Sequence, residues 1–451
     1  MSMWVDSVNG SDAFTGIEAE PKRTLAGLGT LSVDTTYYLV PGSTFNEALT
    51  MPNGTAGIVF DKSTANGPLP IITGDGITAN DTTVALRGAT QKIRNIHVEP
   101  TSHATLRNSI LLATTSVNGI VEYCSGNGTP GFSGTSCVIV CDSTTLGTVR
   151  YCDVLSGNDG IRVDWASGSA AEILYNKVRN VKVDGIRAIS GDFQGRCLLL
   201  GNDVSAFGDD GIDLFNASGV KAIFNEVYSP SADAAGPGSG IKAGAGSSVT
   251  NFIWFNYIHD LLYGSLRYGI NTNGASAPDL ISNIIVNANW GIASLATQTA
   301  GRILNNTSIR CVRGLHSGGN NVTTIMNNIL DGSEFDLKLN AGDNITGGGN
   351  CLKNQSSITG GTYSGTDLLA TDPQLRADYS LPSTSPCKGA GTFVGHYGDF
   401  YGQRFNLAAI DIGAVAYIPP PFPITSRTID ADAVARAITT RTLVSRRGIM
   451  R

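Results

Sequence analysis

Charged and polar side chains recur at one position of a motif that repeats through the middle of the chain. The motif is a glycine, then Ile or Leu, then a variable residue. Alternate residues of a strand point to opposite faces, so an inward aliphatic side chain places the variable one outward. In successive repeats the variable residue is Arg162, Arg187, Asp213, Lys242, Asn271, Ala293 and His316. Stacked in one column, these side chains predict a surface that suits an extended polymer such as a glycan.

Carboxylates concentrate in the same repeats and make acid–base chemistry possible. Hydrolysis of a glycosidic bond needs two carboxyl groups that flank the bond. Asp209 and Asp210 are adjacent, and Asp184 holds the equivalent position one repeat earlier. Asp before Gly is also a common choice in turns, so Asp159, Asp184 and Asp210 could serve the turn alone.

A second chemistry, β-elimination from a uronate, is equally open at this stage. It needs a base that removes a proton from carbon and an acid that protonates the leaving oxygen. Lysine can be that base if a neighbouring cation lowers its pKa, and Lys242 lies within the charged repeats. In either chemistry, contacts to the bound polymer are expected from Arg162, Arg187, Asp184, Asn271, Tyr268 and His259.

Two motifs with one shared period predict the elements that carry these residues. From Gly160 to Gly314, the glycines of the first motif are 25, 26, 29, 29, 22 and 23 residues apart. The second motif is an apolar stretch ending in Asn, with Cys in place of Asn at Cys124 and Cys152. Its asparagines are Asn176, Asn202, Asn225, Asn256, Asn283, Asn306 and Asn328. Short β-like segments with Gly, Asn and Asp at the breaks fit a parallel β-helix, in which the asparagines form a ladder at an inner turn.

The fold class expected is therefore all-β: a single-stranded right-handed parallel β-helix of roughly twelve coils, with one repeat per coil. Residues 1–36 are expected to form an N-terminal entry and cap, and residues 37–349 the β-helix. Residues 350–418 are expected to be strands that close the other end, and residues 419–451 a Pro-rich spacer and basic tail. Eight cysteines without a CxxC pair are expected to be mostly reduced and buried.

Motifs at both ends resemble a known group of proteins. Trp4-Val5-Asp6, Gly10-Ser11-Asp12 and Pro21-Lys22-Arg23-Thr24-Leu25 resemble the entry motif of pectate-lyase-like β-helix proteins. Thr371-Asp372-Pro373 and Asp411-Ile412-Gly413-Ala414 resemble the closing motif of that group, which includes chondroitinase B-like and alginate lyases. Bacteriophage tailspikes use this fold too. The resemblance implies the fold, whereas the activity stays open because the fold hosts lyases, hydrolases, epimerases and binders.

The resemblance also suggests individual roles. Segments 239–243 and 265–269 are similar to the Lys and Arg segments of chondroitinase B-like lyases, which implies Lys242 as base and Arg267 as acid. Those lyases often use Ca²⁺ on the substrate carboxylate, for which Asp210 and Asp213 are candidate ligands; no other cofactor is implied. Gly208-Asp209-Asp210-Gly211-Ile212 looks like the Asp-Asp segment of polygalacturonases, with Asp184 similar to their first Asp.

The charge distribution separates the body of the chain from its tail. The net charge is −6, and residues 424–451 contain six Arg and two Asp, or +4, which leaves −10 for the rest. An acidic body argues against non-specific nucleic-acid binding, and no apolar run is long enough for a membrane span. Four prolines in residues 418–423 end any β structure, and the basic tail beyond them suits an acidic partner surface.

Three functions are compatible with these features. The first is a virion protein of the tailspike type that binds and cleaves a bacterial surface polysaccharide. It would be a homotrimer by analogy and attach to other virion proteins through its tail. No secretory signal is expected at the N-terminus, which favours this interpretation. The second is a non-catalytic virion fibre or receptor-binding protein, and the third is a secreted bacterial polysaccharide lyase or hydrolase.

Overall fold

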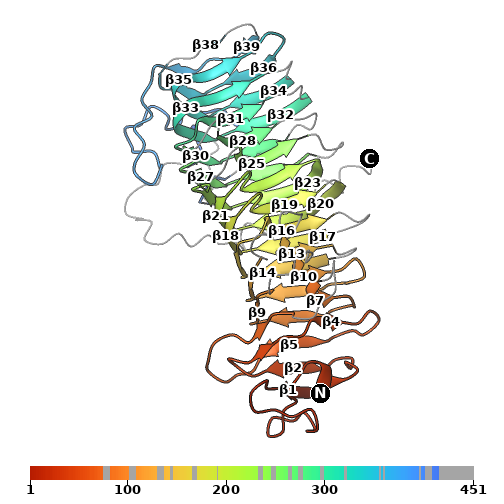
Figure 1. The fold of residues 1–451 in the computed structure, drawn as a ribbon. Coiled ribbons are helices and arrows are strands. Elements are labelled where there is room, and N and C mark those ends of the chain that lie inside the picture. The colour runs from red at the N-terminus through yellow and green to blue at the C-terminus, as the bar shows by residue number, and fades with distance from the viewer. Residues whose placement is uncertain are drawn as a thin grey trace.

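The chain forms a stack of parallel coils in a computed structural model (Figure 1). The structure describes residues 1–74, 82–100, 108–128, 137–142, 146–164, 170–189, 191–231, 237–244, 250–262, 267–272, 278–294, 299–318, 322–354, 357–358, 361–395, 398–401 and 409–415. Within these residues no helix has the length and apolar character needed to cross a membrane.

The first face of the stack is a sheet of fifteen strands, one from each successive coil. Its strand pairings are all parallel, as between β17 and β20. The predicted fold class, an all-β parallel β-helix, is confirmed. The strands are β1 (Ser2–Val5), β2 (Thr36–Leu39), β5 (Val59–Lys62), β8 (Lys92–Arg94), β11 (Ile120–Glu122), β14 (Leu146–Arg150), β17 (Ala170–Leu174), β20 (Gly191–Leu200), β23 (Ala217–Ile223), β26 (Phe252–Trp254), β29 (Asp279–Ile281), β32 (Thr299–Leu304), β34 (Val322–Met326), β36 (Asn344–Gly348) and β39 (Thr362–Ser364).

The second face follows the first across a tight corner in each coil. Its strands belong to a sheet of twenty-five strands that also supplies the third face. They are β3 (Thr44–Phe45), β6 (Ile71–Ile72), β9 (His97–Val98), β12 (Ser125–Asn127), β15 (Asp153–Leu155), β18 (Lys177–Val181), β21 (Asp203–Phe207), β24 (Glu226–Tyr228), β27 (Tyr257–His259), β30 (Ile284–Val286), β37 (Cys351–Leu352) and β40 (Leu368–Leu369).

The third face carries the repeated glycine motif. The long strands β33 (Thr307–Ser317) and β35 (Ile329–Leu339) pair with strands of both the second and the third face and so join them. The third face consists of β4 (Leu49–Met51), β7 (Thr82–Leu86), β10 (Asn108–Leu112), β13 (Cys137–Cys141), β16 (Asp159–Asp164), β19 (Ile186–Ile189), β22 (Ile212–Phe215), β25 (Ser239–Gly244), β28 (Tyr268–Thr272), β31 (Trp290–Ser294) and β38 (Ser357–Ile358).

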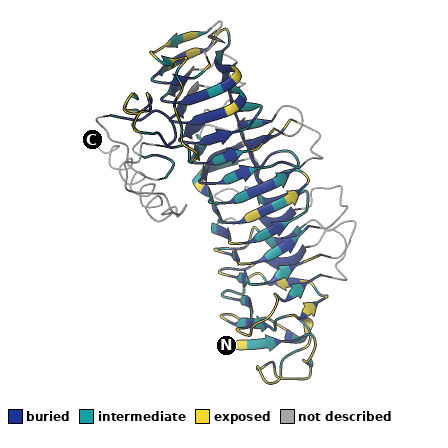
Figure 2. Cartoon of the chain, turned by 90° about the vertical axis from the view of Figure 1, so that its left-hand side faces the viewer, coloured by how far each residue is buried: buried dark blue, intermediate teal, exposed yellow. Residues whose placement is uncertain are grey.

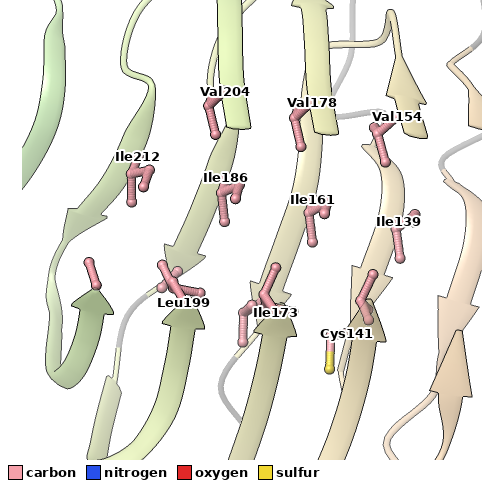
Figure 3. Close-up of a cluster of buried hydrophobic side chains, with 14 of the residues drawn as sticks. Ile139, Cys141, Val154, Ile161, Ile173, Val178, Ile186, Leu199, Val204 and Ile212 are labelled. Atoms are coloured by element: carbon pink, nitrogen blue, oxygen red, sulfur yellow. The ribbon is translucent and has the colours of Figure 1, made fainter. Parts of the chain in front are cut away.

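The core runs along the inside of the stack, and exposed residues lie on the outside (Figure 2). Equivalent aliphatic side chains stack on one another, as Ile161, Ile186 and Ile212 do from the third face and Val178 and Val204 from the second (Figure 3). Each of these five side chains is fully buried. Because inward positions are taken by apolar side chains, any chemistry must use the outward ones.

The asparagines of the second motif form the predicted ladder at the corner between the first and second faces. Each amide nitrogen donates to the amide oxygen one coil further, as from Asn225 to Asn256 and from Asn256 to Asn283, both at 3.0 Å. The residue before each ladder position turns the chain with a positive φ, for example 58° at Phe255. The ladder satisfies buried polar groups and thereby holds neighbouring coils in register.

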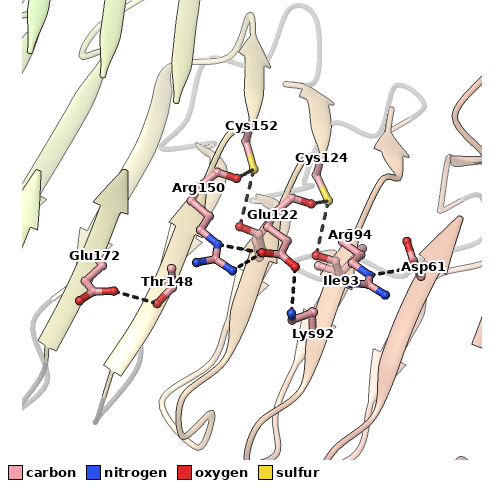
Figure 4. A network of polar contacts seen from close by, with 11 residues as sticks. Asp61, Lys92, Ile93, Arg94, Glu122, Cys124, Thr148, Arg150, Cys152 and Glu172 are labelled. Atoms are coloured by element: carbon pink, nitrogen blue, oxygen red, sulfur yellow. Dashed lines mark hydrogen bonds and ion pairs between the residues drawn. The ribbon is translucent and has the colours of Figure 1, made fainter. Parts of the chain in front are cut away.

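Cys124 and Cys152 continue the ladder column toward the N-terminus. Their thiols contact the backbone oxygens of Ile93 and Val121, each at 3.7 Å (Figure 4). All eight cysteines are free and buried, so the predicted reduced, buried state is confirmed. Beside them on the first face, Glu122 accepts from Lys92 at 2.8 Å and from Arg150 at 2.7 Å (Figure 4). The charges of this network are thus paired with one another.

The two ends of the chain are built differently. Near the N-terminus, β1 is the first strand of the first face. The short 3-10 helix η1 (Ala26–Leu28) follows, and Leu25, which precedes it, and Leu28, its last residue, are buried in the core. After β40, the chain returns along the outside of the coils that precede it. The backbone amide of Ala414 donates to Thr307 at 2.9 Å, and the Phe400 ring packs on Phe224. These contacts place the last described residues on the side of the stack, whereas β37 to β40, earlier in the segment expected to close the end, lie in its sheets.

Candidate active site on the third face

The variable residues of the glycine motif form a single outward column. Strand register aligns Arg162 with Arg187, Arg187 with Asp213, and Asp213 with Lys242. Lys242 is in turn aligned with Asn271. Neighbouring strands of a sheet lie about 4.8 Å apart, so each side chain contacts those of the adjacent coils. The predicted column is therefore present, with its charged members on consecutive coils.

A buried carboxylate cluster lies beside this column. Asp184, Asp210 and Asp213 each place a carboxylate oxygen within 4.8 Å of the other two. Their exposed fractions are 2%, 1% and 5%. Asp184 and Asp210 precede the motif glycines on adjacent coils, and the backbone amide of Asp210 donates to Asp184 at 3.2 Å. Asp184 and Asp210 thus connect neighbouring coils and meet in one cluster.

Two cations from the column face these carboxylates. The guanidinium of Arg187 lies 3.3 Å from Asp213, 3.6 Å from Asp184 and 3.8 Å from Asp159. Lys242 donates to Asp210 at 2.9 Å. Arg187 and Lys242 keep 38% and 26% of their side chains exposed, so they lie between the buried carboxylates and solvent. Asp159, which sequence reasoning assigned to a turn, joins the cluster because it occupies the same motif position as Asp184 and Asp210.

Among these carboxyl groups, Asp184 has the environment that most favours the protonated form. Burial, followed by the charges of Asp213, Asp210 and Asp159, raises the pKa of Asp184 to about 8. Burial and Asp209 raise the pKa of Asp210 to about 6 although Lys242 opposes the shift. A carboxylic acid that keeps its proton near neutral pH can act as a general acid, as long as a second carboxylate stays ionised.

Lys242 is not in the environment that a lysine base requires. Burial lowers its pKa, but the carboxylates of Asp210, Asp213 and Asp209 outweigh that effect, so the pKa of Lys242 is raised overall. A base at neutral pH needs the opposite shift. The arrangement instead keeps Lys242 charged and paired with Asp210.

Arg267 lies beneath the surface. It has no exposed area, and its guanidinium donates to the backbone oxygens of Asp209 at 2.7 Å and Gly208 at 3.0 Å. A Cβ on Gly238 would come within 2.0 Å of this guanidinium, so the glycine leaves room for it. Arg267 is therefore placed to hold the turn that presents Asp210, and not to protonate a leaving oxygen.

The remaining candidates are divided between two faces. Arg162 pairs with Asp164 at 2.8 Å, and Asp209 is half-buried beside the cluster. Tyr268 and Asn271 are on β28, the third-face strand that pairs with the strand of Lys242. His259 is on β27 of the second face, where it contacts Asp260 at 2.9 Å and Glu226 at 3.3 Å. The structure thus brings Asp184, Asp210, Asp213, Arg187 and Lys242 together and leaves His259 in a separate group.

The carboxylate cluster fits calcium poorly. Ca²⁺ takes six to eight oxygen ligands. In each of Asp184, Asp210 and Asp213, one oxygen already accepts a backbone amide, from Asp210, Ser239 and Phe215 respectively. Arg187 and Lys242 already pair with Asp213 and Asp210 at 3.3 Å and 2.9 Å. The cations of the protein therefore take the place of a metal ion in balancing these charges.

Comparisons with known proteins show similar solved structures and no family. No protein-family model matches the chain, and no curated protein does. Nineteen chains of solved structures match. XylC in complex with xylose is 8% identical, with 92% of this chain and 94% of that chain covered and a TM-score of 0.49. The A-module of the mannuronan C-5 epimerase AlgE6 from Azotobacter vinelandii is 12% identical, with 82% and 97% covered and a TM-score of 0.49.

A tailspike structure is also among the similar ones. The Dettilon tailspike protein is 15% identical, with 86% of this chain and 62% of that chain covered and a TM-score of 0.37. A rhamnogalacturonan lyase and a PL6 family alginate lyase are also among the similar structures. These similarities assign no function to the chain, so the function has to be argued from the residues of the third face.

Proposed function

We propose that the third face binds a polysaccharide and hydrolyses its glycosidic bonds, with Asp184 as the general acid. The observation that carries this proposal is the buried cluster in which Asp184 holds a proton near neutral pH beside Asp213 and Asp210. Hydrolysis needs such a pair of carboxyl groups with different pKa values. Elimination finds less support, because Lys242 is held as a cation and Arg267 is buried.

The reaction follows from the positions of these groups. Asp184 donates its proton to the glycosidic oxygen, which leaves as a hydroxyl when the bond to the anomeric carbon breaks. Asp213, which is less buried than Asp210, supplies the second carboxylate. The carboxylates of the cluster each place an oxygen within 4.8 Å of the others, which suits the mechanism with closely spaced carboxyl groups, in which the carboxylate attacks the anomeric carbon and forms a bond to the sugar. Water then releases the sugar from that carboxylate and restores the proton of Asp184.

Arg187 and Lys242 influence the ionisation of Asp184 and Asp213 without taking part in bond breaking. Arg187 lies closer to Asp213 than to Asp184, so it favours ionisation of the attacking carboxylate over that of the acid. Lys242 neutralises Asp210 and limits the negative charge around Asp184. Substrate must displace or pass Arg187, whose partly exposed side chain covers the cluster.

Product chemistry tests the proposal. Purified protein is incubated with surface polysaccharides of candidate host bacteria, and new reducing ends and unsaturated sugar ends are measured in parallel. Hydrolysis predicts new reducing ends without the ultraviolet absorbance of unsaturated ends, and Asp184→Asn should lower the rate by at least ~10²-fold. Asp153→Asn on the second face is the matched control, since its half-exposed carboxylate pairs with Arg179 away from the cluster. Unsaturated products would overturn the mechanism, and binding without products would leave a non-catalytic receptor-binding protein.

We further propose that the protein is a virion component of the tailspike type, assembled as a homotrimer. Support comes from the unequal charge of the sequence, in which a +4 tail at 424–451 follows an acidic body. A basic tail on an acidic rod suits docking to an acidic partner surface. Residues 416–451 are outside the described residues, so the tail is a proposal from the sequence alone. Mass spectrometry of purified phage particles should detect the chain; its presence only in culture supernatant would favour a secreted bacterial enzyme.

A further inference from the structure

Three buried polar atoms on the third face have no hydrogen-bond partner among the described residues. They are Oδ1 of Asn271, Nε1 of Trp290 and Nδ1 of His316. Asn271 and His316 are each only 8% exposed. The register aligns Asn271 with Ala293 and Ala293 with His316, and Trp290 is on the same strand as Ala293. Three consecutive coils next to the carboxylate cluster thus each contribute one unsatisfied polar atom, and such atoms are rare in buried positions.

The hydrogen-bonding character of each atom can be assigned. Oδ1 of Asn271 is an acceptor, and Nε1 of Trp290 is a donor. His316 contacts Oδ1 of Asn340 through Nε2 at 3.3 Å, which makes Nε2 the donor and Nδ1 an acceptor in the neutral ring. Burial lowers the pKa of His316 and so favours the neutral ring. Two acceptors therefore accompany one donor.

The Trp290 ring offers its edge and not its faces. Tyr268 and His316 lie against it, with ring centroids 5.8 Å and 5.0 Å away, and the Arg313 guanidinium is 4.3 Å from its centroid. A sugar ring has little room to stack on an indole covered in this way. Nε1, at its edge, is the polar atom of the indole, and it is buried without a hydrogen-bond partner among the described residues.

The cations of these coils are committed elsewhere. Arg313 donates to Glu334 at 2.6 Å besides contacting Trp290. Lys338, one coil beyond His316, lies 5.7 Å from the ring centre of Phe335. This part of the third face differs from the cluster of charges around Arg187 and Lys242, because aromatic and amide groups surround the ion pair of Arg313 and Glu334.

We propose that Asn271, Trp290 and His316 form a subsite for the hydroxyl groups of an uncharged sugar residue. Each hydroxyl donates one hydrogen and also accepts, so two neighbouring hydroxyls of a sugar can satisfy all three atoms, whereas a carboxylate cannot donate to either acceptor. This assignment rests on the proposed glycan-binding function and adds its substrate class: a polysaccharide with neutral residues on the C-terminal side of the carboxylate cluster. A uronate is disfavoured where its carboxylate would face these acceptors.

Glycan binding tests the subsite independently of cleavage. The full chain carrying Asp184→Asn is applied to an array of neutral and uronate-containing bacterial oligosaccharides, and the strongest binder is then titrated by calorimetry. Trp290→Phe removes the Nε1 donor and keeps an aromatic ring, and Asn271→Leu removes the acceptor. Each should weaken binding roughly 3- to 10-fold, the effect of one lost hydrogen bond between uncharged groups. The matched control is Trp254→Phe, because Nε1 of Trp254 is also unpartnered among the described residues but lies on the first face.

The outcomes separate this subsite from the catalytic proposal. Preference for neutral oligosaccharides, with weakening in Trp290→Phe and Asn271→Leu but not in Trp254→Phe, is the expected result. Preference for uronate oligosaccharides, or unchanged affinity in both subsite variants, overturns the subsite even if cleavage still depends on Asp184. Absence of binding to every glycan on the array overturns it as well, and cleavage of a host polysaccharide then decides whether the catalytic proposal stands.

Discussion

Replacement of Asp184 by Asn should make the protein more stable at neutral pH while it removes activity. Asn has nearly the shape of a protonated Asp and keeps the oxygen that accepts the backbone amide of Asp210. The two proteins therefore differ in their free energy of unfolding mainly by the cost of protonating Asp184 on folding. A residue selected for acid catalysis is expected to show this opposition of stability and activity.

The magnitude follows from the shift in pKa. The pKa of Asp184 is about 8 in the folded protein against 3.8 for an ordinary Asp. The folded state therefore binds a proton that the unfolded state releases, and stability falls as pH rises from about 4 to about 8. At pH 7 the wild type is destabilised by up to ~4 kcal/mol relative to pH below 4, at 1.36 kcal/mol per pH unit. The amide introduced by Asp184→Asn has no proton to release, so the variant escapes this loss.

The assay is the midpoint of urea unfolding for both proteins at pH 4, 5.5 and 7. The advantage of Asp184→Asn over wild type should grow steadily across this range. Asp153→Asn, which alters a half-exposed carboxylate paired with Arg179, should show no such growth. If the difference between Asp184→Asn and wild type is the same at pH 4 and pH 7, Asp184 is ionised in the folded protein and cannot be the general acid.

The pH profile, metal dependence, the asparagine ladder and the tail each provide a further prediction. Turnover should fall as pH rises through about 8, because Asp184 loses its proton there; a rate that keeps rising above pH 9 would contradict this. Dialysis against EDTA should leave turnover unchanged, since Arg187 and Lys242 already balance the cluster, and a loss restored by Ca²⁺ would reveal a metal site. Asn256→Ala should cost roughly 2–4 kcal/mol in urea unfolding, because it leaves buried ladder partners unsatisfied, whereas an unchanged midpoint would refute the role of the ladder. Deletion after Tyr417 should leave the circular dichroism of the rod intact but prevent incorporation into its particle, as judged by sedimentation.

The loss of the Arg267 side chain is a contrasting case to the catalytic variants. Its guanidinium holds the backbone of Gly208 and Asp209, so truncation would disturb the turn that presents Asp210. Similarity to a lyase segment predicted Arg267 as an acid, whereas its burial and backbone contacts indicate a structural role. A buried positioning arginine and a catalytic arginine have the same sequence letter, and only burial and partners distinguish them.

The coil architecture could be predicted from the sequence, because the repeat is a local pattern. Each glycine motif and each ladder asparagine, such as Asn256, occurs at a fixed phase within its own coil. Equivalent motif positions of successive coils stack on one another and set the register. The spacing of the motifs therefore predicts the column from Arg162 to Lys242. The free, buried cysteines were predicted from the absence of a CxxC pair and the hydrophobic character of free Cys.

The ion pairs and the burial of the charged side chains could not be predicted from the sequence and are seen only in the tertiary structure. Lys242 pairs with Asp210 across 32 residues, and that contact determines the direction of its pKa shift. The pKa of Asp184 depends on burial and on charges from neighbouring coils, neither of which is a property of its own segment. The return of residues up to Ala414 along the side of the stack likewise depends on contacts with Thr307, far away in sequence. A repeat encodes spacing along the chain, whereas electrostatic energy depends on distances and solvent access in space.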